Sequence, residues 1–367
     1  MRVAVVAYEH PDPLGTAAGR ALWAWCEGML ALGHDLDAWS WYPRPPVREL
    51  PSWCRWEPVR VGSLWRAHAR GLVKPRWDAA LGGFSPSEGV IAVADDVPSF
   101  AAVARAHRSA VTIHYRALAD ARALRHLDAA SVQTARAERR AAARASVVLG
   151  YSERVARFAG VGQFRGASRC VPIAHPIPER VVDPVDKPVA ALVADWSWQP
   201  NVVALGRLLG LWPEVEDRVS GARLIVAGRN VERCEIGSVP GVEVIGEVRD
   251  SVEVLSRAAV VAFPCPPTSG PKVKVLEALA HGICVVTTPA GIEGLSVHDG
   301  EGAVVCGMAT FAAGLARVLS DAQVRAGIAA AGRQAVAIHH SPEAAARSRS
   351  AAFEALQASI PGERQSG

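Results

Sequence analysis

The chain has 367 residues, half of them hydrophobic, which is enough for two globular domains that each bury a sizeable core. Its formal net charge of +4 is too small to predict a nucleic-acid-binding protein. Seven cysteines without a C-x-x-C pair indicate neither a zinc site nor a disulfide framework, so we expect reduced, buried thiols. The N-terminus lacks the layout of a signal peptide, and no apolar run reaches the roughly 20 residues that span a bilayer. We therefore expect a cytoplasmic protein, at most peripheral to a membrane.

Arginine supplies nearly all of the basic charge, as is typical of GC-rich bacterial genomes. Lysine occurs at four positions, namely Lys74, Lys187, Lys272 and Lys274. Lys272 and Lys274 lie two residues apart. In a chain that otherwise uses arginine, this spacing indicates that the segment needs compact ammonium groups. The alternative is that both lysines were retained by chance.

The first half of the chain alternates strands and helices. We expect a strand at 2–8, a helix at 16–32 and a strand at 35–41, which together form a βαβ unit of a parallel sheet. Residues 43–87 show no clear periodicity. The expected elements that follow are strands at 89–94, 110–114 and 146–151, with a long Ala/Arg-rich helical region between the last two.

A proline-dense stretch then predicts an inter-domain connection, and the alternation restarts beyond it. Expected strands are 189–194, 222–227, 242–245, 258–263 and 283–287. Expected helices are 201–211, 251–257, 274–281, 310–338 and 342–358. We predict an N-terminal domain at 1–175, a linker at 176–188, a second domain at 189–338, a helix at 339–358 that returns toward the first domain, and a flexible tail at 359–367. The fold class is α/β, with two doubly wound, Rossmann-like domains that face each other across a cleft.

The segment after the strand at 258–263 carries the strongest chemical signal. A loop with Gly270 leads into a helix near Lys272, and backbone N–H groups at such a helix start form an anion site. Lys272 and Lys274 could neutralise a diphosphate, and Glu277 could accept hydrogen bonds from ribose hydroxyls. These residues together suit a nucleotide sugar, whereas the alternative is a surface helix with a Lys–Glu pair.

Residues 269–282, SGPKVKVLEALAHG, resemble the signature of the retaining glycosyltransferases of the GT4-type group 1, which have the GT-B fold. Further motifs support the resemblance in the correct order. They are WQPN at 198–201, IVAGR at 225–229, GEVRD at 246–250, CVVTT at 284–288 and GIEGL at 291–295.

The resemblance implies donor-binding roles for this segment. Glu277 corresponds to the second Glu of an E-x7-E motif, which holds the donor ribose. Lys274 lies where a basic residue meets the diphosphate and stabilises the leaving group, with Lys272 assisting, and Gly270 lies where the backbone meets the donor. Ser269 stands where the first Glu is expected, which leaves recognition of the donor sugar undefined.

Other donor-site residues follow from the accompanying motifs. Asn201 belongs to the motif that opens the first helix of the second domain. Arg229 follows a strand end and is a catalytic candidate. Gly246 and Val248 lie where backbone groups meet the nucleobase.

The N-terminal half matches the family less well. Gly15 and Thr16 are a reduced version of a Gly-Gly loop that contacts donor phosphate. His114, at a strand end, corresponds to a position where related enzymes place a histidine near the reacting sugar, and the alternative is a core or edge histidine. Asp95 and Asp96 are adjacent and not alternate, so we expect a solvated pair and no metal site.

The long helical region of the first half contains a basic segment, with Arg136, Arg139, Arg140 and Arg144. This segment predicts a solvated face or, alternatively, contact with an anionic membrane or acceptor.

The expected activity is metal-independent transfer of a sugar, with retention of configuration, from a UDP- or GDP-linked donor to a glycan, lipid-linked glycan or natural-product aglycone. The donor is a co-substrate, and no cofactor is expected. Two alternatives stay open: a nucleotide-sugar epimerase on the same fold, and an inactive subunit that binds a partner transferase.

Overall fold

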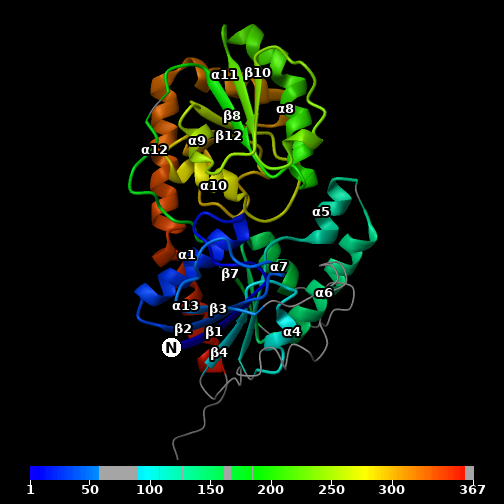
Figure 1. Cartoon of the computed structure of the whole chain (residues 1–367), viewed down its shortest axis with the longest axis vertical. Coiled ribbons are helices and arrows are strands. Elements are labelled where there is room, and N and C mark those ends of the chain that lie inside the picture. Colours follow the sequence, from blue (N-terminus) through cyan, green and yellow to red (C-terminus); the bar gives the residue numbers. More distant parts are fainter. Residues whose placement is uncertain (58–89, 107, 126, 161–166, 184, 360–367) are drawn as a thin grey trace, which may run out of the picture. The chain divides into compact units, whose positions relative to one another are not determined.

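The computed structural model describes residues 1–57, 90–106, 108–125, 127–160, 167–183 and 185–359. The chain forms two compact units (Figure 1). Unit 1 comprises residues 1–176 together with the chain from Ser341 onward, and unit 2 comprises Ile177–His340. Most of the aperiodic segment 43–87 and nearly all of the predicted tail lie outside the described residues.

Unit 1 is built on a parallel sheet. Its described residues form seven strands in the order β3-β2-β1-β4-β5-β6-β7. The strands are β1 (Arg2–Ala7), β2 (Asp35–Ser40), β3 (Cys54–Trp56), β4 (Val90–Ala94), β5 (Ser109–Ile113), β6 (Val147–Gly150) and β7 (Ala167–Cys170). The predicted strands of this half are therefore confirmed to within one or two residues, whereas β3 and β7 were not predicted.

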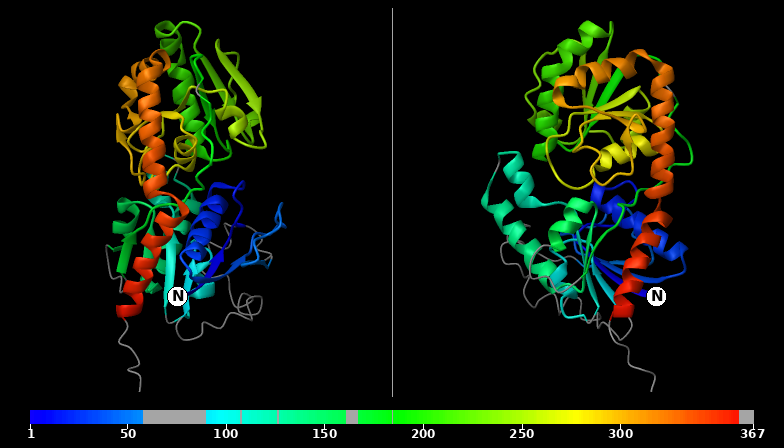
Figure 2. Two further views of the ribbon diagram at one scale, coloured as in Figure 1. Left: turned by 90° about the vertical axis from the view of Figure 1, so that its left-hand side faces the viewer. Right: turned by 180° about the vertical axis from the view of Figure 1, so that it is seen from behind.

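The helices of unit 1 include one from the far end of the chain. They are α1 (Ala17–Ala31), α4 (Phe100–Val103), α5 (Ala117–Ala123), α6 (Ala129–Arg144), α7 (Glu153–Gly160) and α13 (Pro342–Ser359). Helix α13 packs against α1 (Figure 2), and a Cβ on Gly28 of α1 would overlap the carbonyl oxygen of Pro342. Glycine at position 28 thus permits the close approach of the two helices.

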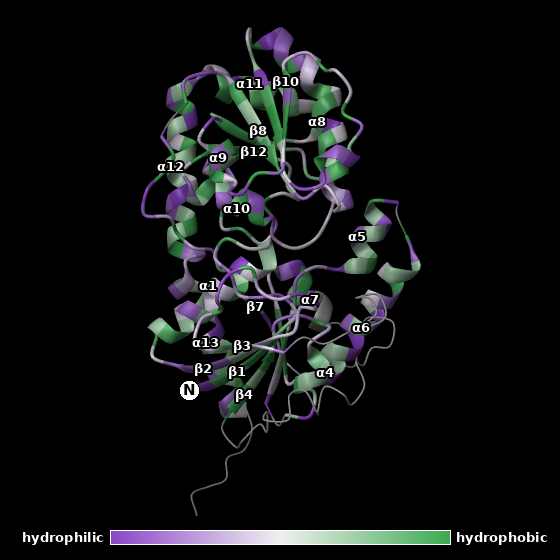
Figure 3. Cartoon of the chain, viewed as in Figure 1, coloured by the Kyte–Doolittle hydropathy of each residue, from purple (hydrophilic) through white to green (hydrophobic). Residues whose placement is uncertain are grey.

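Unit 2 repeats the architecture. Its described strands pair in parallel in the order β10-β9-β8-β11-β12-β14-β13. They are β8 (Val189–Val193), β9 (Arg223–Ala227), β10 (Val242–Gly246), β11 (Val260–Phe263), β12 (Cys284–Thr287), β13 (His298–Asp299) and β14 (Gly302–Val305). Strands β8 and β12 are hydrophobic along their length (Figure 3), because helices cover both faces of a parallel sheet.

The helices of unit 2 correct two predictions. They are α8 (Gln199–Arg218), α9 (Val252–Leu255), α10 (Val273–Ala280), α11 (Phe311–Ser320) and α12 (Ala322–His339), with short 3-10 turns η1 (Val231–Arg233) and η2 (Met308–Thr310). Helix α8 continues past its expected end at Leu211 and through Pro213, since the buried side chains of Trp212 and Val215 hold its last turns. The expected helix 310–338 is two helices, because the side chain of Asp321 accepts the N–H of Val324 and starts a new one.

The cysteines are only partly as expected. All seven are unpaired, and five are buried, but Cys170 is exposed and Cys234 is partly exposed. Cys170 lies on β7, whose side chains are largely exposed, and this is the physical reason for the difference.

Candidate active site

Lys274 and Asn201 form the centre of the candidate site in unit 2. Lys274 lies in the first turn of α10, and its Nζ donates a hydrogen bond to Oδ1 of Asn201 in the first turn of α8. Asn201 is only 3% exposed, and its Nδ2 donates to the carbonyl of Asp195 at 2.7 Å. Both ends of the amide are occupied, so Asn201 fixes the position of the ammonium group.

The surroundings of Lys274 are mostly apolar. Its Nζ lies 4.3 Å from the ring centroid of Phe263 and 5.7 Å from that of Trp198. Burial, with a contribution from the neighbouring charge of Lys272, lowers the pKa of Lys274 to about 7. Among the described residues Lys274 forms no ion pair, so an anion beside it would favour its charged form.

Lys272 organises the loop that precedes α10. Its side chain is 3% exposed, and its Nζ donates to the carbonyl of Ser269 at 3.2 Å and also to that of Gly270. These contacts hold the loop with charge-assisted hydrogen bonds. Direct assistance to a diphosphate by Lys272 stays a prediction.

Gly270 has a backbone conformation that favours glycine, with φ at +75°. Its N–H donates to Oε1 of Glu293 at 3.0 Å. The Glu293 carboxylate thus accepts the hydrogen bond of the Gly270 N–H. The neighbouring Ser269 is buried.

Glu277 lies one turn further along α10 and is buried. Its Oε1 accepts a hydrogen bond from Oγ of Ser251 at 2.6 Å, and Ser251 directly precedes α9. This contact fixes one carboxylate oxygen of Glu277.

Arg229 is half exposed and pairs with Asp195, with 3.4 Å between its guanidinium nitrogen and Oδ2. Burial alone would raise the pKa of Asp195, but hydrogen bonds from Ser197 and Asn230 and the charge of Arg229 lower it. Asp195 therefore stays ionised near neutral pH and partly compensates the charge of Arg229.

The predicted nucleobase-contacting residues lie at the end of β10. Gly246 has φ at +89°, its carbonyl accepts the N–H of Gly228 at 2.7 Å, and a Cβ at Gly246 would meet no atom within 4 Å. The Val248 side chain is partly buried against the hydrophobic cluster around Val254 and Ala258. Contact of the Val248 backbone with a nucleobase stays a prediction.

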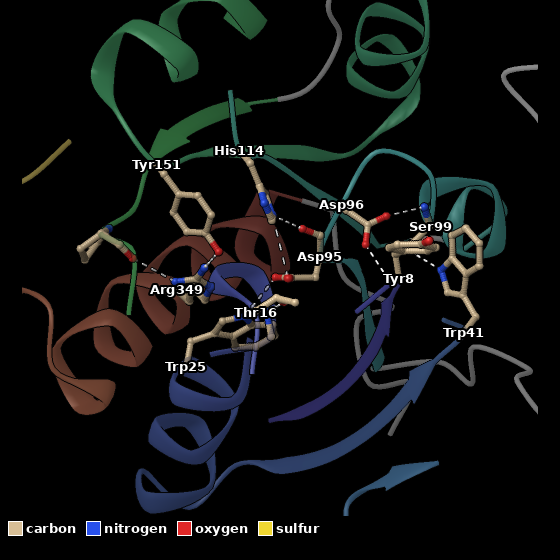
Figure 4. A network of polar contacts seen from close by, with 12 residues as sticks. Tyr8, Thr16, Trp25, Trp41, Asp95, Asp96, Ser99, His114, Tyr151 and Arg349 are labelled. Carbon is tan, nitrogen blue, oxygen red and sulfur yellow. Dashed lines mark hydrogen bonds and ion pairs between the residues drawn. The ribbon is translucent and has the colours of Figure 1, made fainter. Parts of the chain in front are cut away.

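In unit 1, His114 follows the end of β5. Its Nε2 lies 2.5 Å from the carbonyl oxygen of Asp95, and its ring centroid lies 5.1 Å from that of Tyr151 (Figure 4). The imidazole side chain is 26% exposed, so it is neither a core residue nor freely solvated.

The expectation of a solvated Asp95–Asp96 pair is wrong. Asp95 is 3% exposed, and its Oδ1 accepts the indole N–H of Trp25 at 3.0 Å. Asp96 accepts the backbone N–H groups of Tyr8 at 2.7 Å and Ser99 at 2.8 Å (Figure 4). Each carboxylate thus binds one group that is distant in the sequence, Trp25 for Asp95 and Tyr8 for Asp96. In the described part of the chain, no three His, Cys, Asp or Glu side chains cluster as metal ligands.

The Gly15–Thr16 loop forms a helix cap. Oγ1 of Thr16 accepts the N–H of Gly19 at 3.1 Å and donates to the Glu9 carboxylate at 3.2 Å. The N–H of Gly15 donates to the carbonyl of Asp12 at 3.1 Å. Two carboxylates, of Glu9 and Asp12, border this loop, which disfavours a phosphate there, and donor contact by Gly15 and Thr16 stays a prediction.

Residues 187–321 match the family model described as Glycosyl transferases group 1. This part of the chain is thus similar to a group 1 glycosyl transferase domain. It contains all the unit 2 residues of the candidate site, including Lys274, Asn201 and Glu277.

Solved structures extend the likeness beyond the glycosyl transferase domain to the whole chain. Sucrose-phosphate synthase from Thermosynechococcus elongatus superposes with a TM-score of 0.74 at 15% identity, covering 98% of this chain and 100% of that chain. Trehalose-6-phosphate synthase OtsA gives 0.69 at 10% identity, with 99% and 100% covered. Anabaena Alr3699/HepE, in a complex with UDP-glucose, gives 0.67 at 14% identity, with 96% and 99% covered. The chain thus has the GT-B fold of two Rossmann-like units. A comparison with curated protein sequences gave no match.

Three residues of the glycosyl transferase domain were missed as site residues. Ser251 binds Glu277, Asp195 pairs with Arg229, and Glu293 binds the loop at Gly270. The GEVRD and GIEGL motifs border or contain Ser251 and Glu293, but the motifs give no partner for either residue.

Proposed function

We propose that the chain is a glycosyltransferase that moves a sugar from a nucleoside diphosphate sugar to a hydroxyl group of an acceptor. Unit 2 binds the donor, and unit 1 binds the acceptor. The group 1 glycosyl transferase domain in unit 2 and the GT-B fold of the chain support this assignment.

The observation that carries the proposal is the placement of Lys274. The buried ammonium of Lys274, with no ion pair among the described residues, lies in the first turn of α10, beside Lys272 and the positive end of the helix. A diphosphate supplies the negative charge that this place lacks.

The other donor contacts are those to the ribose and the nucleobase. Glu277, with one oxygen fixed by Ser251, accepts hydrogen bonds from ribose hydroxyls. The backbone from Gly246 to Val248 meets the nucleobase. Because HepE was solved in complex with UDP-glucose, a UDP-linked donor is the first to test, with GDP-linked donors next.

The proposed reaction retains the configuration of the sugar. The bond from C1 to the diphosphate oxygen breaks, and the nucleoside diphosphate leaves with the electron pair. The acceptor oxygen attacks C1 from the same face, and its proton passes to the leaving diphosphate. Lys274 and Arg229 stabilise the negative charge on the leaving group, and His114 contacts the reacting sugar. No metal takes part, so chelation with EDTA is expected to leave the rate unchanged.

The acceptor is a glycan, a lipid-linked glycan or a natural-product aglycone. We place the protein in the cytoplasm with possible peripheral membrane contact through α6, on which Arg136, Arg139, Arg140 and Arg144 are all exposed. In the described part of the chain, no helix has the length and apolar character needed to cross a membrane.

The proposal is tested by release of nucleoside diphosphate from a panel of UDP- and GDP-sugars, with and without acceptors. Lys274→Ala is expected to lower kcat about 100-fold, as loss of one charge-stabilising donor does in other enzymes. Lys187→Ala is the matched control, because Lys187 is exposed in the linker region. An unchanged kcat in Lys274→Ala would remove Lys274 from the mechanism, and donor turnover without acceptor would favour an epimerase.

A further inference from the structure

The hydrogen bond of His114 determines which ring nitrogen carries the proton. Nε2 faces the carbonyl oxygen of Asp95 at 2.5 Å, and a carbonyl can only accept. The neutral imidazole therefore has its proton on Nε2 and a lone pair on Nδ1. None of the described residues hydrogen-bonds Nδ1, so that lone pair is available to a ligand.

The side chain of Asp95 faces the same nitrogen. Its Oδ2 lies 3.9 Å from Nε2 of His114, while its Oδ1 is fixed by the indole N–H of Trp25 (Figure 4). An anionic carboxylate beside Nε2–H draws positive charge toward that side of the ring and strengthens Nδ1 as a hydrogen-bond acceptor.

The counter-charge comes from helix α13. Arg349 is fully buried, donates to Tyr151 Oη at 3.0 Å and to the carbonyl of Pro172 at 3.2 Å, and lies 4.8 Å over the Trp25 ring. Arg349 forms no ion pair among the described residues. The buried guanidinium of Arg349 and the buried carboxylate of Asp95 both contact Trp25, so their opposite charges partly compensate each other at longer range.

We propose that Asp95 and Arg349 are positioning residues for His114, which they hold with Nδ1 presented as the acceptor for a substrate hydroxyl. This inference rests on the proposed glycosyltransferase function. It makes the C-terminal helix, through Arg349, part of the machinery of unit 1.

The charges around Asp95 give the proposal a measurable pH dependence. Burial raises the pKa of Asp95 to about 6, while the charges of His114 and Arg349 oppose the rise and that of Asp96 adds to it. Two further titratable groups face Asp95, namely Cys26 and Tyr151, and burial raises the pKa of both well above neutral pH, so they remain uncharged.

Substitutions at the two positions have opposite electrostatic effects. Asp95→Asn keeps an acceptor for Trp25 but removes the negative charge that favours the proton on Nε2 of His114, so the Nδ1–H tautomer becomes populated. Arg349→Met removes a positive charge, so Asp95 holds its proton to higher pH. Arg349→Lys keeps the charge and is expected to titrate like the wild type.

The test is NMR spectroscopy of the full chain, in which histidine-selective ¹⁵N labels report the tautomer of His114 and aspartate ¹³C-carboxyl labels report the titration midpoint of Asp95, without any need for activity. The proposal expects the proton on Nε2 of His114 in the wild type, a population of the Nδ1–H tautomer in Asp95→Asn, and a higher Asp95 midpoint in Arg349→Met. Asp37→Asn and Arg347→Met are the matched controls on the surface of unit 1, the latter also on α13, and they leave the midpoint unchanged. If Arg349→Met does not fold, Asp95→Asn and Arg349→Lys carry the test.

Kinetics provide the second readout. Asp95→Asn is expected to lower kcat by up to about 100-fold, as misplacement of a reacting group does, with the KM for the donor unchanged. A proton on Nδ1 in the wild type, or the same tautomer population in Asp95→Asn and the wild type, would overturn the inference. Absence of transfer by the wild type together with the expected NMR result would instead count against the proposed function alone.

Discussion

Asn201 holds the ammonium group of Lys274, although 73 residues separate them in the sequence. The same amide donates to the carbonyl of Asp195, so one buried side chain joins α8, the loop after β8 and α10. Lys274 is thus placed by a neutral partner and forms no ion pair among the described residues.

Loss of the Asn201 side chain should therefore weaken the donor site. Asn201→Ala is expected to lower the affinity for UDP by about 10-fold or more, since a hydrogen bond to a charged group contributes about 1.5–3 kcal/mol. Isothermal titration calorimetry measures this change, with Gln199→Ala, an exposed neighbour on α8, as the control. Asn201→Asp should bind UDP more weakly still, because its carboxylate competes with the diphosphate for Lys274. Wild-type affinity in Asn201→Ala would show that Lys274 does not depend on this contact.

Binding of a nucleoside diphosphate should be accompanied by proton uptake. The pKa of Lys274 is lowered to about 7 in the free protein, and an adjacent diphosphate raises it. At pH 8 free Lys274 is mostly neutral and the bound form is mostly charged, so affinity falls as pH rises above 7. Calorimetry in buffers of different ionisation enthalpy is expected to give an uptake approaching one proton. Lys274→Met should abolish the uptake; if uptake persists in this variant, another group is responsible.

Glu277 should affect nucleoside binding and leave phosphate binding unchanged. Glu277→Gln keeps an oxygen that can accept from Ser251 but loses the negative charge offered to ribose hydroxyls. We expect about a 10-fold loss of UDP affinity, in line with one charge-assisted hydrogen bond, and unchanged affinity for inorganic pyrophosphate. Parallel calorimetric titrations with the two ligands separate these effects. An equal loss for both ligands would mean that Glu277 stabilises the loop and does not contact the ribose.

The basic face of α6 should bind anionic lipid surfaces if the proposed membrane contact is correct. Arg136, Arg140 and Arg144 follow one another at four-residue spacing, so they lie on one side of the helix. Replacing all three by Gln should weaken binding to phosphatidylglycerol-containing vesicles by about 3 kcal/mol, at about 1 kcal/mol per basic residue. Co-sedimentation measures the effect, with neutral phosphatidylcholine vesicles as the control. Equal sedimentation of the wild type with both kinds of vesicle would leave this stripe as a solvated face.

The sequence predicted best those parts of the candidate site whose residues lie close together on one helix or strand. Lys274 and Glu277 share one short helix, and the strand before that helix is a continuous apolar run, so both the element and its residues could be predicted. The positions of the strands followed from the same apolar runs. By contrast, the end of α8 depends on the packing of Trp212 beyond a proline, which local rules do not contain.

Partners that come together only through tertiary structure could not be predicted. Asp95 was expected to be solvated, because two adjacent aspartates at a strand end usually are, but its indole partner Trp25 lies 70 residues away. Ser251 and Glu293 are ordinary polar residues until the fold brings them to Glu277 and Gly270. Such contacts depend on the packing of whole elements and leave no local pattern.

Calorimetry with UDP, GDP and dTDP tests most directly whether unit 2 is a nucleoside diphosphate site centred on Lys274. The wild type and Lys187→Met are expected to bind at least one of the three with the same affinity, while Lys274→Met binds it at least about 10-fold more weakly and remains folded. No binding of any of the three to the wild type, or equal affinity in Lys274→Met, would rule out such a site.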